Sequence, residues 1–210
     1  MKNYLKKTIC LDFDSKEVQA LIAEFKTNDI DEIEKAKGIY LKIRDEWRYN
    51  PYSISFDAEK YKASTIAQRD EGHCVDKAIL LAACLRGLNI PSRLRFAKVT
   101  NHIAVEKLTE RFGTNVLTPH GMVEVYLNQK WLKATPAFNK ELCEMCNVKP
   151  LEFDGENDSM FQEYNGDGQQ FMEYLEDYGH FDDVPLTFMR DNMMEHYPEV
   201  FNSNKVDYSF

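Results

Sequence analysis

The chain has 210 residues, of which 43% are hydrophobic, enough to bury one sizeable core. Its 26 basic and 35 acidic residues give a formal net charge of −9, which argues against nucleic acid or an anionic membrane as the main partner. Five cysteines do not make a disulfide framework, and no signal-peptide core or membrane-spanning apolar run is found. We therefore expect a reduced, cytoplasmic protein with a single domain over residues 1–210.

The first fifty residues predict two helices. Asp14 and Glu17 have the spacing of a capping box, and apolar side chains recur at helical intervals over residues 18–25. A second helix is expected over residues 29–50, because the residue before Pro51 is driven out of the helical conformation. This part of the chain is expected to be a helical lead-in.

The most regular pattern in the sequence is a buried helix over residues 75–88. It follows Cys74 directly, and Gly87 with Pro91 marks its end as a C′ glycine and a following proline. A short helical turn over residues 64–68, capped by its serine, is expected before it.

Strands are predicted after this helix. Residues 93–96 alternate polar and apolar side chains, as a strand does. Residues 122–127 and 130–135 flank Asn128-Gln129, which predicts a β-hairpin with a two-residue turn. Residues 102–113 are ambiguous and are expected to be partly helical.

Cys74 lies where a helix begins, and this position has chemical consequences. Unpaired backbone N–H groups and the positive end of the helix dipole stabilise a thiolate there. The same N–H groups can hold an oxyanion that develops on a substrate carbonyl. Gly72 would let a substrate backbone approach. The alternative is that Cys74 is simply a small buried side chain.

His120 is the histidine best placed to act as the base, since it leads directly into the hairpin. With a two-residue turn, Met122 lies opposite Thr135, and Thr135 becomes the diagonal neighbour of His120. A threonine can fix the orientation of the ring, whereas a carboxylate would also stabilise the imidazolium. Asn139 is the next candidate for this third role, if the chain turns back after Pro136.

The other histidines fit the role less well. His73 is adjacent to Cys74 in the chain, and neighbouring side chains on a helix do not face each other. His102, His180 and His196 are in segments without recognisable chemical context. Clustered Arg86, Arg93 and Arg95 are expected at exposed positions.

Four blocks of sequence in this order resemble the transglutaminase-like superfamily of cysteine enzymes. They are residues 72–78 (Gly-His-Cys-Val-Asp-Lys-Ala), residues 85–93 (Leu-Arg-Gly-Leu-Asn-Ile-Pro-Ser-Arg), residues 120–126 (His-Gly-Met-Val-Glu-Val-Tyr), and Trp131 with Thr135-Pro136. The upstream segment from Ile43 to Tyr49 is also similar to the lead-in helix of that superfamily.

This resemblance implies an α+β, papain-like fold, in which a central helix bearing Cys74 packs against an antiparallel β-sheet carrying His120. It also implies a catalytic core over residues 51–140. The third residue of the family is usually an Asp before a Pro, and this chain has Thr135 there. Gln68, six residues before Cys74, has the separation of the oxyanion donor in papain-like proteases. The alternative interpretation is that Gln68 is simply a polar residue on a short exposed helix.

Residues 141–210 are expected to be a loop-rich cover. Cys143 and Cys146 form a lone CxxC without a second ligand pair, so no metal and no cofactor are expected. The acidic residues 153–159 lack EF-hand spacing and are expected to form a solvated loop. The aromatic-rich segment 141–185 is hypothesised to fold over the cleft and shape access for the substrate.

The leading hypothesis is a cysteine enzyme that acts on amide bonds of a peptide or protein substrate through a Cys74–His120 dyad, with Thr135 orienting His120. Water as acceptor gives a protease or amidase, and an amine gives acyl transfer of the transglutaminase type. Similarity to small bacterial-type members of the family favours the hydrolase, and the negative net charge favours a neutral or basic peptide. The alternative is a catalytically silent module that binds a peptide or protein. A third hypothesis, a redox or metal protein built on Cys143 and Cys146, predicts bound zinc or a low-potential disulfide.

Overall fold

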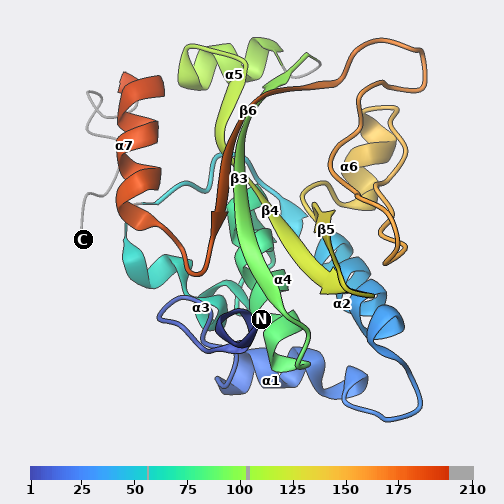
Figure 1. The fold of residues 1–210 in the computed structure, drawn as a ribbon. Helices are drawn as coiled ribbons and strands as arrows, with labels where there is room; N and C mark the ends of the chain where they lie inside the picture. Colours follow the sequence, from blue (N-terminus) through green and yellow to red (C-terminus); the bar gives the residue numbers. More distant parts are fainter. Residues whose placement is uncertain (56, 103–104, 199–210) are drawn as a thin grey trace.

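A computed structural model describes residues 1–55, 57–102 and 105–198 (Figure 1). Helix α4 (Cys74–Gly87) packs against a four-stranded antiparallel sheet whose strands follow the order β5-β4-β3-β6. The remaining helices surround this pair. The predicted α+β class, with a central helix bearing Cys74 on an antiparallel sheet, is confirmed.

The N-terminal segment contains the two predicted helices at shifted boundaries. The 3-10 turns η1 (Lys2–Leu5) and η2 (Ala23–Phe25) flank α1 (Lys16–Ile22), and α2 spans Glu32–Glu46. The capping box expected at Asp14 is wrong, because Ser15 is the N-cap of α1 and Asp14 forms an ion pair with Lys7. Asp31 caps α2.

Helix α2 ends at Glu46, so the end predicted at Asn50 is also wrong. The chain instead forms β1 (Arg48–Tyr49), which pairs in parallel with β2 (Glu71–Gly72). Between these strands lie η3 (Ala58–Tyr61) and α3 (Ala63–Ile66). Ser64 lies inside α3 and does not cap it, since Lys62 is the N-cap residue.

Helix α4 begins where the sequence predicts. Its N-cap is His73, whose Nδ1 accepts from the backbone N–H of Asp76, while the Asp76 carboxylate accepts from the N–H of His73. This reciprocal arrangement is a capping box in which a histidine replaces the usual Ser or Thr. At the other end, Asn89 has a φ of 61°. Gly87 is still helical there, and a Cβ on it would lie 2.7 Å from Ile22 Cδ1, so this glycine permits the close approach of α1.

The hairpin has the predicted register. β4 (Val116–Leu127) and β5 (Lys130–Ala134) pair Leu127 with Lys130, and the two turn residues both have positive φ, 47° at Asn128 and 64° at Gln129. β3 (Ser92–Asn101) is longer than the predicted strand and lies between β4 and β6.

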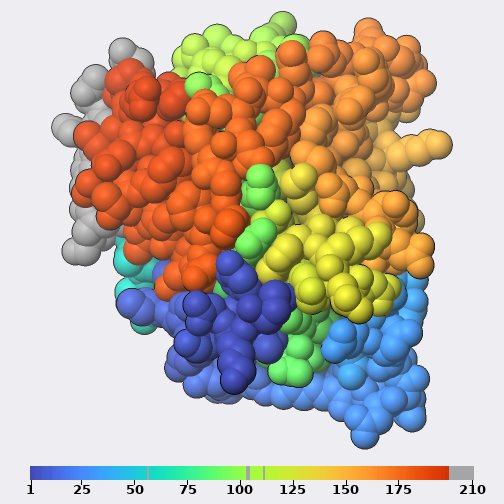
Figure 2. Space-filling view, viewed as in Figure 1, coloured from blue at the N-terminus to red at the C-terminus, as the bar shows by residue number. Residues whose placement is uncertain are grey.

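The C-terminal part is more regular than the sequence suggests. β6 (Met172–Phe181) pairs with β3 along its length, and α7 (Leu186–His196) follows it. The shorter helices α5 (Val105–Phe112) and α6 (Lys140–Met145) complete the fold. Figure 2 shows how the orange and red atoms of this C-terminal part cover the upper portion of one face. The prediction of a loop-rich segment is therefore wrong for β6 and α7.

Two apolar clusters hold the site in place. The main cluster joins α4 to the sheet through residues such as Val123 and Val125, and a second, smaller cluster contains Met122. Alternate residues of β4 thus contribute to different clusters, as the pleat of a strand requires. Arg86 was expected to be exposed, but it is buried and donates to the carbonyl oxygens of Ser92 and Asp182.

Candidate active site

Cys74 is the first residue of α4, and its side chain is 6% exposed. Burial raises the pKa of the thiol to about 11, while hydrogen bonding from the backbone N–H groups of Gly121, Val75 and Cys74 itself lowers it. The sulfur thus lies among backbone donors at the positive end of a helix. Such donors stabilise negative charge on a sulfur or on a nearby substrate oxygen.

Gly121 is the residue that lets β4 approach the start of α4. A Cβ at this position would lie 2.8 Å from Val75 Cα and 3.1 Å from Val75 N. Only glycine therefore permits this separation between the strand and the helix N-terminus. The sequence contains this glycine in a recognisable block, but nothing in the pattern identifies its function.

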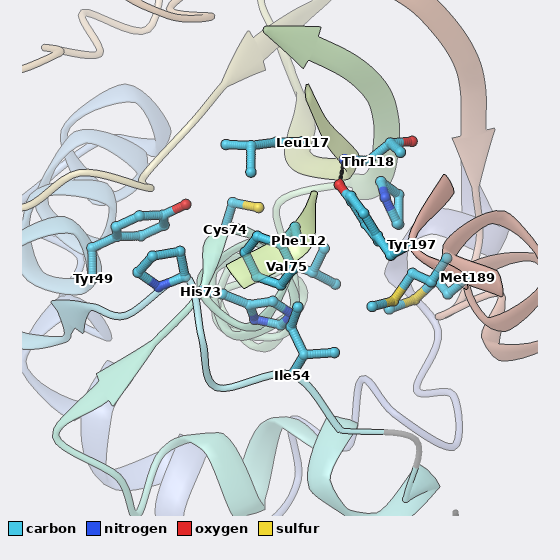
Figure 3. Close-up of a pocket in the computed structure, with 13 residues that line it drawn as sticks. Tyr49, Ile54, His73, Cys74, Val75, Phe112, Leu117, Thr118, Met189 and Tyr197 are labelled. Carbon is cyan, nitrogen blue, oxygen red and sulfur yellow. Dashed lines mark hydrogen bonds between the residues drawn. The ribbon is translucent and has the colours of Figure 1, made fainter. Parts of the chain in front are cut away.

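A pocket lies over Cys74. Figure 3 shows the sulfur directed into it, between Tyr49 on one side and Tyr197 on the other. The lining is mostly apolar and comes from both ends of the chain: Tyr49, Pro51, Ile54, His73, Cys74, Val75, Phe112, Leu117, Thr118, Pro119, Met189, Met193 and Tyr197.

Helix α7 and the residue after it form one wall of this pocket. The Tyr197 hydroxyl accepts from the backbone N–H of Thr118 at 2.7 Å and donates to the carbonyl of Val116 at 2.9 Å. The C-terminal part of the chain is thereby fastened to β4 just before His120. This wall comes from α7 and Tyr197, and none of the described residues that line the pocket belongs to segment 141–185, which was hypothesised to fold over the cleft.

His120 is 2% exposed, and neither ring nitrogen has a hydrogen-bond partner within the described chain. Burial, followed by the nearby His73, lowers the pKa of His120 to about 4, so the imidazole is neutral at pH 7. The thiol and the imidazole are thus both uncharged in this arrangement, and no hydrogen bond joins them.

Thr135 lies at the edge of the same small cavity as His120. It is 4% exposed, and its Oγ1 is also without a hydrogen-bond partner among the residues that the structure describes. Asn139 is used elsewhere, since its Oδ1 accepts from the Tyr49 N–H and its Nδ2 donates to Glu141.

The structure does not bring Gln68 to the pocket around Cys74. Its side chain is exposed, and its Nε2 donates to the Ser64 carbonyl at 2.9 Å, one turn back. The oxyanion role of Gln68 therefore stays a prediction that requires this bond to break. The backbone donors near the sulfur need no such change.

Lys77 is a residue that sequence reasoning missed. It is fully buried on α4, and its Nζ donates to the carbonyls of Arg44, Trp47 and Ala137, each at 2.8 Å. Three donors meet three acceptors, so the charge is fully hydrogen-bonded. The sequence feature that could have identified it is a lysine inside an otherwise apolar helical run. Lys77 connects the helix that carries Cys74 to the segment that follows Thr135.

The remaining thiols show no special environment. Cys10, Cys84 and Cys143 are buried, Cys146 is half-buried, and all are free. Within residues 1–55, 57–102 and 105–198, no group of three or more His, Cys, Asp or Glu side chains could hold a metal ion. No helix in the same part of the chain is long and apolar enough to cross a membrane.

Comparisons with known proteins show which family this chain is similar to. The model of the family described as "Transglutaminase-like superfamily" matches residues 19–136, a range that contains Cys74, His120 and Thr135. A crystal structure from Cytophaga hutchinsonii, described as a "Putative Cysteine Protease", is 19% identical. The alignment covers 63% of this chain and 40% of that one, with a TM-score of 0.47. No curated protein matches the chain.

Proposed function

Because the chain belongs to the transglutaminase-like superfamily, we propose that it is a cysteine-nucleophile enzyme that acts on amide bonds through Cys74 and His120. Family membership supports a cysteine-type enzyme in general. The observation that carries the specific proposal is the position of Cys74, the first residue of a buried helix, with backbone N–H groups near its sulfur that lower the thiol pKa and a pocket above it.

The proposed reaction has two stages. His120, neutral at pH 7, accepts the thiol proton while the sulfur attacks the amide carbonyl, and it then returns that proton to the leaving amine. A thioester on Cys74 results. In the second stage, water or an amine attacks the thioester, His120 accepts the proton of the acceptor, and the proton returns to the departing sulfur.

The negative charge on the carbonyl oxygen needs donors that are already in place. The backbone N–H groups near the sulfur, from Cys74, Val75 and Gly121, are the candidates, because they are fixed by the start of α4 and by β4. Thr135 is proposed to orient His120. Gln68 is a less favoured oxyanion donor, because its Nε2 already donates to the Ser64 carbonyl.

The lining of the pocket over Cys74 indicates which kind of substrate side chain would fit there. It is mostly apolar, so we propose an acyl group that carries a bulky apolar side chain, within a neutral or basic peptide that suits the net charge of −9. We propose hydrolysis rather than amine transfer, because the sequence resembles the small bacterial-type members of the superfamily. We propose that the protein works in the cytoplasm, since five free thiols suit a reducing compartment.

A second candidate function is a silent module that binds a peptide without cleaving it. Three observations favour it: the buried, protonated thiol, the lack of a partner for either His120 ring nitrogen among the described residues, and Thr135 in place of a carboxylate. The retained cysteine and histidine oppose it.

Trapping of the acyl-enzyme tests the proposal. The protein is incubated with p-nitroanilides of acetylated amino acids, with and without a primary amine, and tryptic peptides are examined by mass spectrometry. We expect acylation of the Cys74 peptide, lost in Cys74→Ala and slowed at least about 100-fold in His120→Ala. Cys146→Ser serves as the control for a half-buried thiol that is not at the site. An acyl group that persists in Cys74→Ala, or peptide binding without any turnover, would reject the enzyme.

A further inference from the structure

The cavity beside His120 contains more polar groups than a core cavity should leave without partners. Its lining includes His120, Thr135 and Gln162 among otherwise mostly apolar side chains. Both ring nitrogens of His120 and the Oγ1 of Thr135 are buried without a hydrogen bond in the described chain. A neutral imidazole carries one N–H that needs an acceptor, and burying it unsatisfied is costly.

Gln162 is held at this cavity by its neighbours in the chain. Ser159 pairs with the end of β5 through two backbone hydrogen bonds. Its N–H donates to the Lys133 carbonyl at 2.8 Å, and its carbonyl accepts from the Thr135 N–H at 2.9 Å. The carbonyl of Glu163 accepts from the Phe171 N–H. The segment that carries Gln162 is thus fixed on both sides.

The amide of Gln162 is also oriented. Its Nε2 donates to the Lys149 carbonyl at 3.0 Å and contacts Cys143 Sγ at 3.7 Å. No described residue donates to its Oε1, so the amide of this lining residue keeps a free acceptor while its nitrogen is anchored. A hydroxyl such as that of Thr135 rotates freely, whereas an amide anchored through its nitrogen does not.

We propose that Gln162 is a positioning residue for His120: its Oε1 accepts the ring N–H through a single bridging water, for which the cavity has room. The inference rests on the proposed function, because it assigns the third member of the Cys74–His120 pair. An amide can serve in this way, as the asparagine of papain-like Cys-His-Asn sites does. Here the acceptor comes from the segment after β5, and it takes the orienting role that was proposed for Thr135, the residue before Pro136.

Three variants test this assignment. Gln162→Leu keeps the approximate volume but removes the acceptor, Gln162→Glu restores it as a carboxylate, and Thr135→Val removes the competing hydroxyl. Gln169→Leu is the matched control, since Gln169 is exposed in the same segment and bonds only to Asn165. Thermal unfolding of each variant shows whether the fold is retained.

The decisive readout is the ¹⁵N side-chain spectrum of His120, assigned by its loss in His120→Gln. We expect His120 to adopt a single tautomer in the natural protein and a mixture of tautomers in Gln162→Leu. In Gln162→Glu we expect a raised pKa of His120, because a carboxylate stabilises the imidazolium. His73 is the other titratable group near the ring and is followed in the same spectra. We expect kcat to fall by about 10- to 100-fold in Gln162→Leu with little change in KM, and to recover in Gln162→Glu.

The outcomes separate the two proposals. An unchanged tautomer in Gln162→Leu, or a change that occurs only in Thr135→Val, overturns the assignment of Gln162. A shifted tautomer in a protein that never forms an acyl-enzyme supports the contact while rejecting the enzyme, because the spectrum does not depend on turnover.

Discussion

The backbone of Val75 lies so close to Gly121 that a Cβ on the glycine would be 2.8 Å from Val75 Cα. This contact joins the first turn of α4 to the strand that carries His120. It therefore fixes the separation of the two proposed catalytic elements, largely through main-chain atoms.

Replacement of Gly121 by alanine should disrupt both stability and the site. The added methyl group forces β4 away from the start of α4, which we expect to cost about 1–3 kcal/mol of unfolding free energy. We also expect acylation of Cys74 to fall by more than tenfold, since its N–H donors move. Chemical denaturation and acyl-enzyme trapping measure the two effects. Gly113→Asn, at an exposed glycine of positive φ with open space around it, should change neither.

Loosening α7 should expose the thiol. In Tyr197→Phe, the N–H of Thr118 and the carbonyl of Val116 lose their shared partner, so α7 docks less tightly, at a cost of about 1–3 kcal/mol. We expect iodoacetamide to label Cys74 faster than in the natural protein. Tyr164→Phe, a change at an exposed tyrosine, is the control. Equal labelling rates in the two variants would show that α7 does not limit access.

The sequence was sufficient for the part of the site that depends on local pattern. The helix start at Cys74 and the hairpin register follow from periodicity and turn chemistry, and both are confirmed. The cap of α4 was missed because a histidine replaces the usual serine or threonine. β6 was missed because its residues alternate weakly: much of the strand is exposed, and it pairs with β3 from far along the chain. Long-range pairing of this kind leaves no local signal.

The buried imidazole should make stability depend on pH. The folded-state pKa of His120 is lowered to about 4 from 6.5, so between these values the unfolded chain binds a proton that the folded chain does not. The free energy of unfolding should therefore fall as the pH drops from 6.5 to 4. This residue alone should account for roughly 3 kcal/mol of that fall, and its contribution should stay constant below pH 4. Urea unfolding across this range measures it, and the contribution should vanish in His120→Gln. A loss of equal size in that variant would assign the effect to other groups.

Removal of the buried ammonium should destabilise the fold strongly. Lys77→Met leaves the carbonyls of Arg44, Trp47 and Ala137 without their donor, and we expect a loss of about 3–5 kcal/mol. Lys37→Met, which removes a surface ion pair with Glu34, should leave the free energy of unfolding almost unchanged, because water screens such pairs. Equal denaturation midpoints for the two variants would contradict the structural role of Lys77.

The position of β6 next to β3 has a consequence for the integrity of the whole sheet. β3 is an inner strand only because residues 172–181 pair with it. A chain cut before residue 172 would keep Cys74, His120 and the hairpin but leave ten residues of β3 as an open edge. Unpaired edges of that length recruit strands from other molecules. Such a fragment should aggregate, so β6 also keeps neighbouring copies of the protein apart.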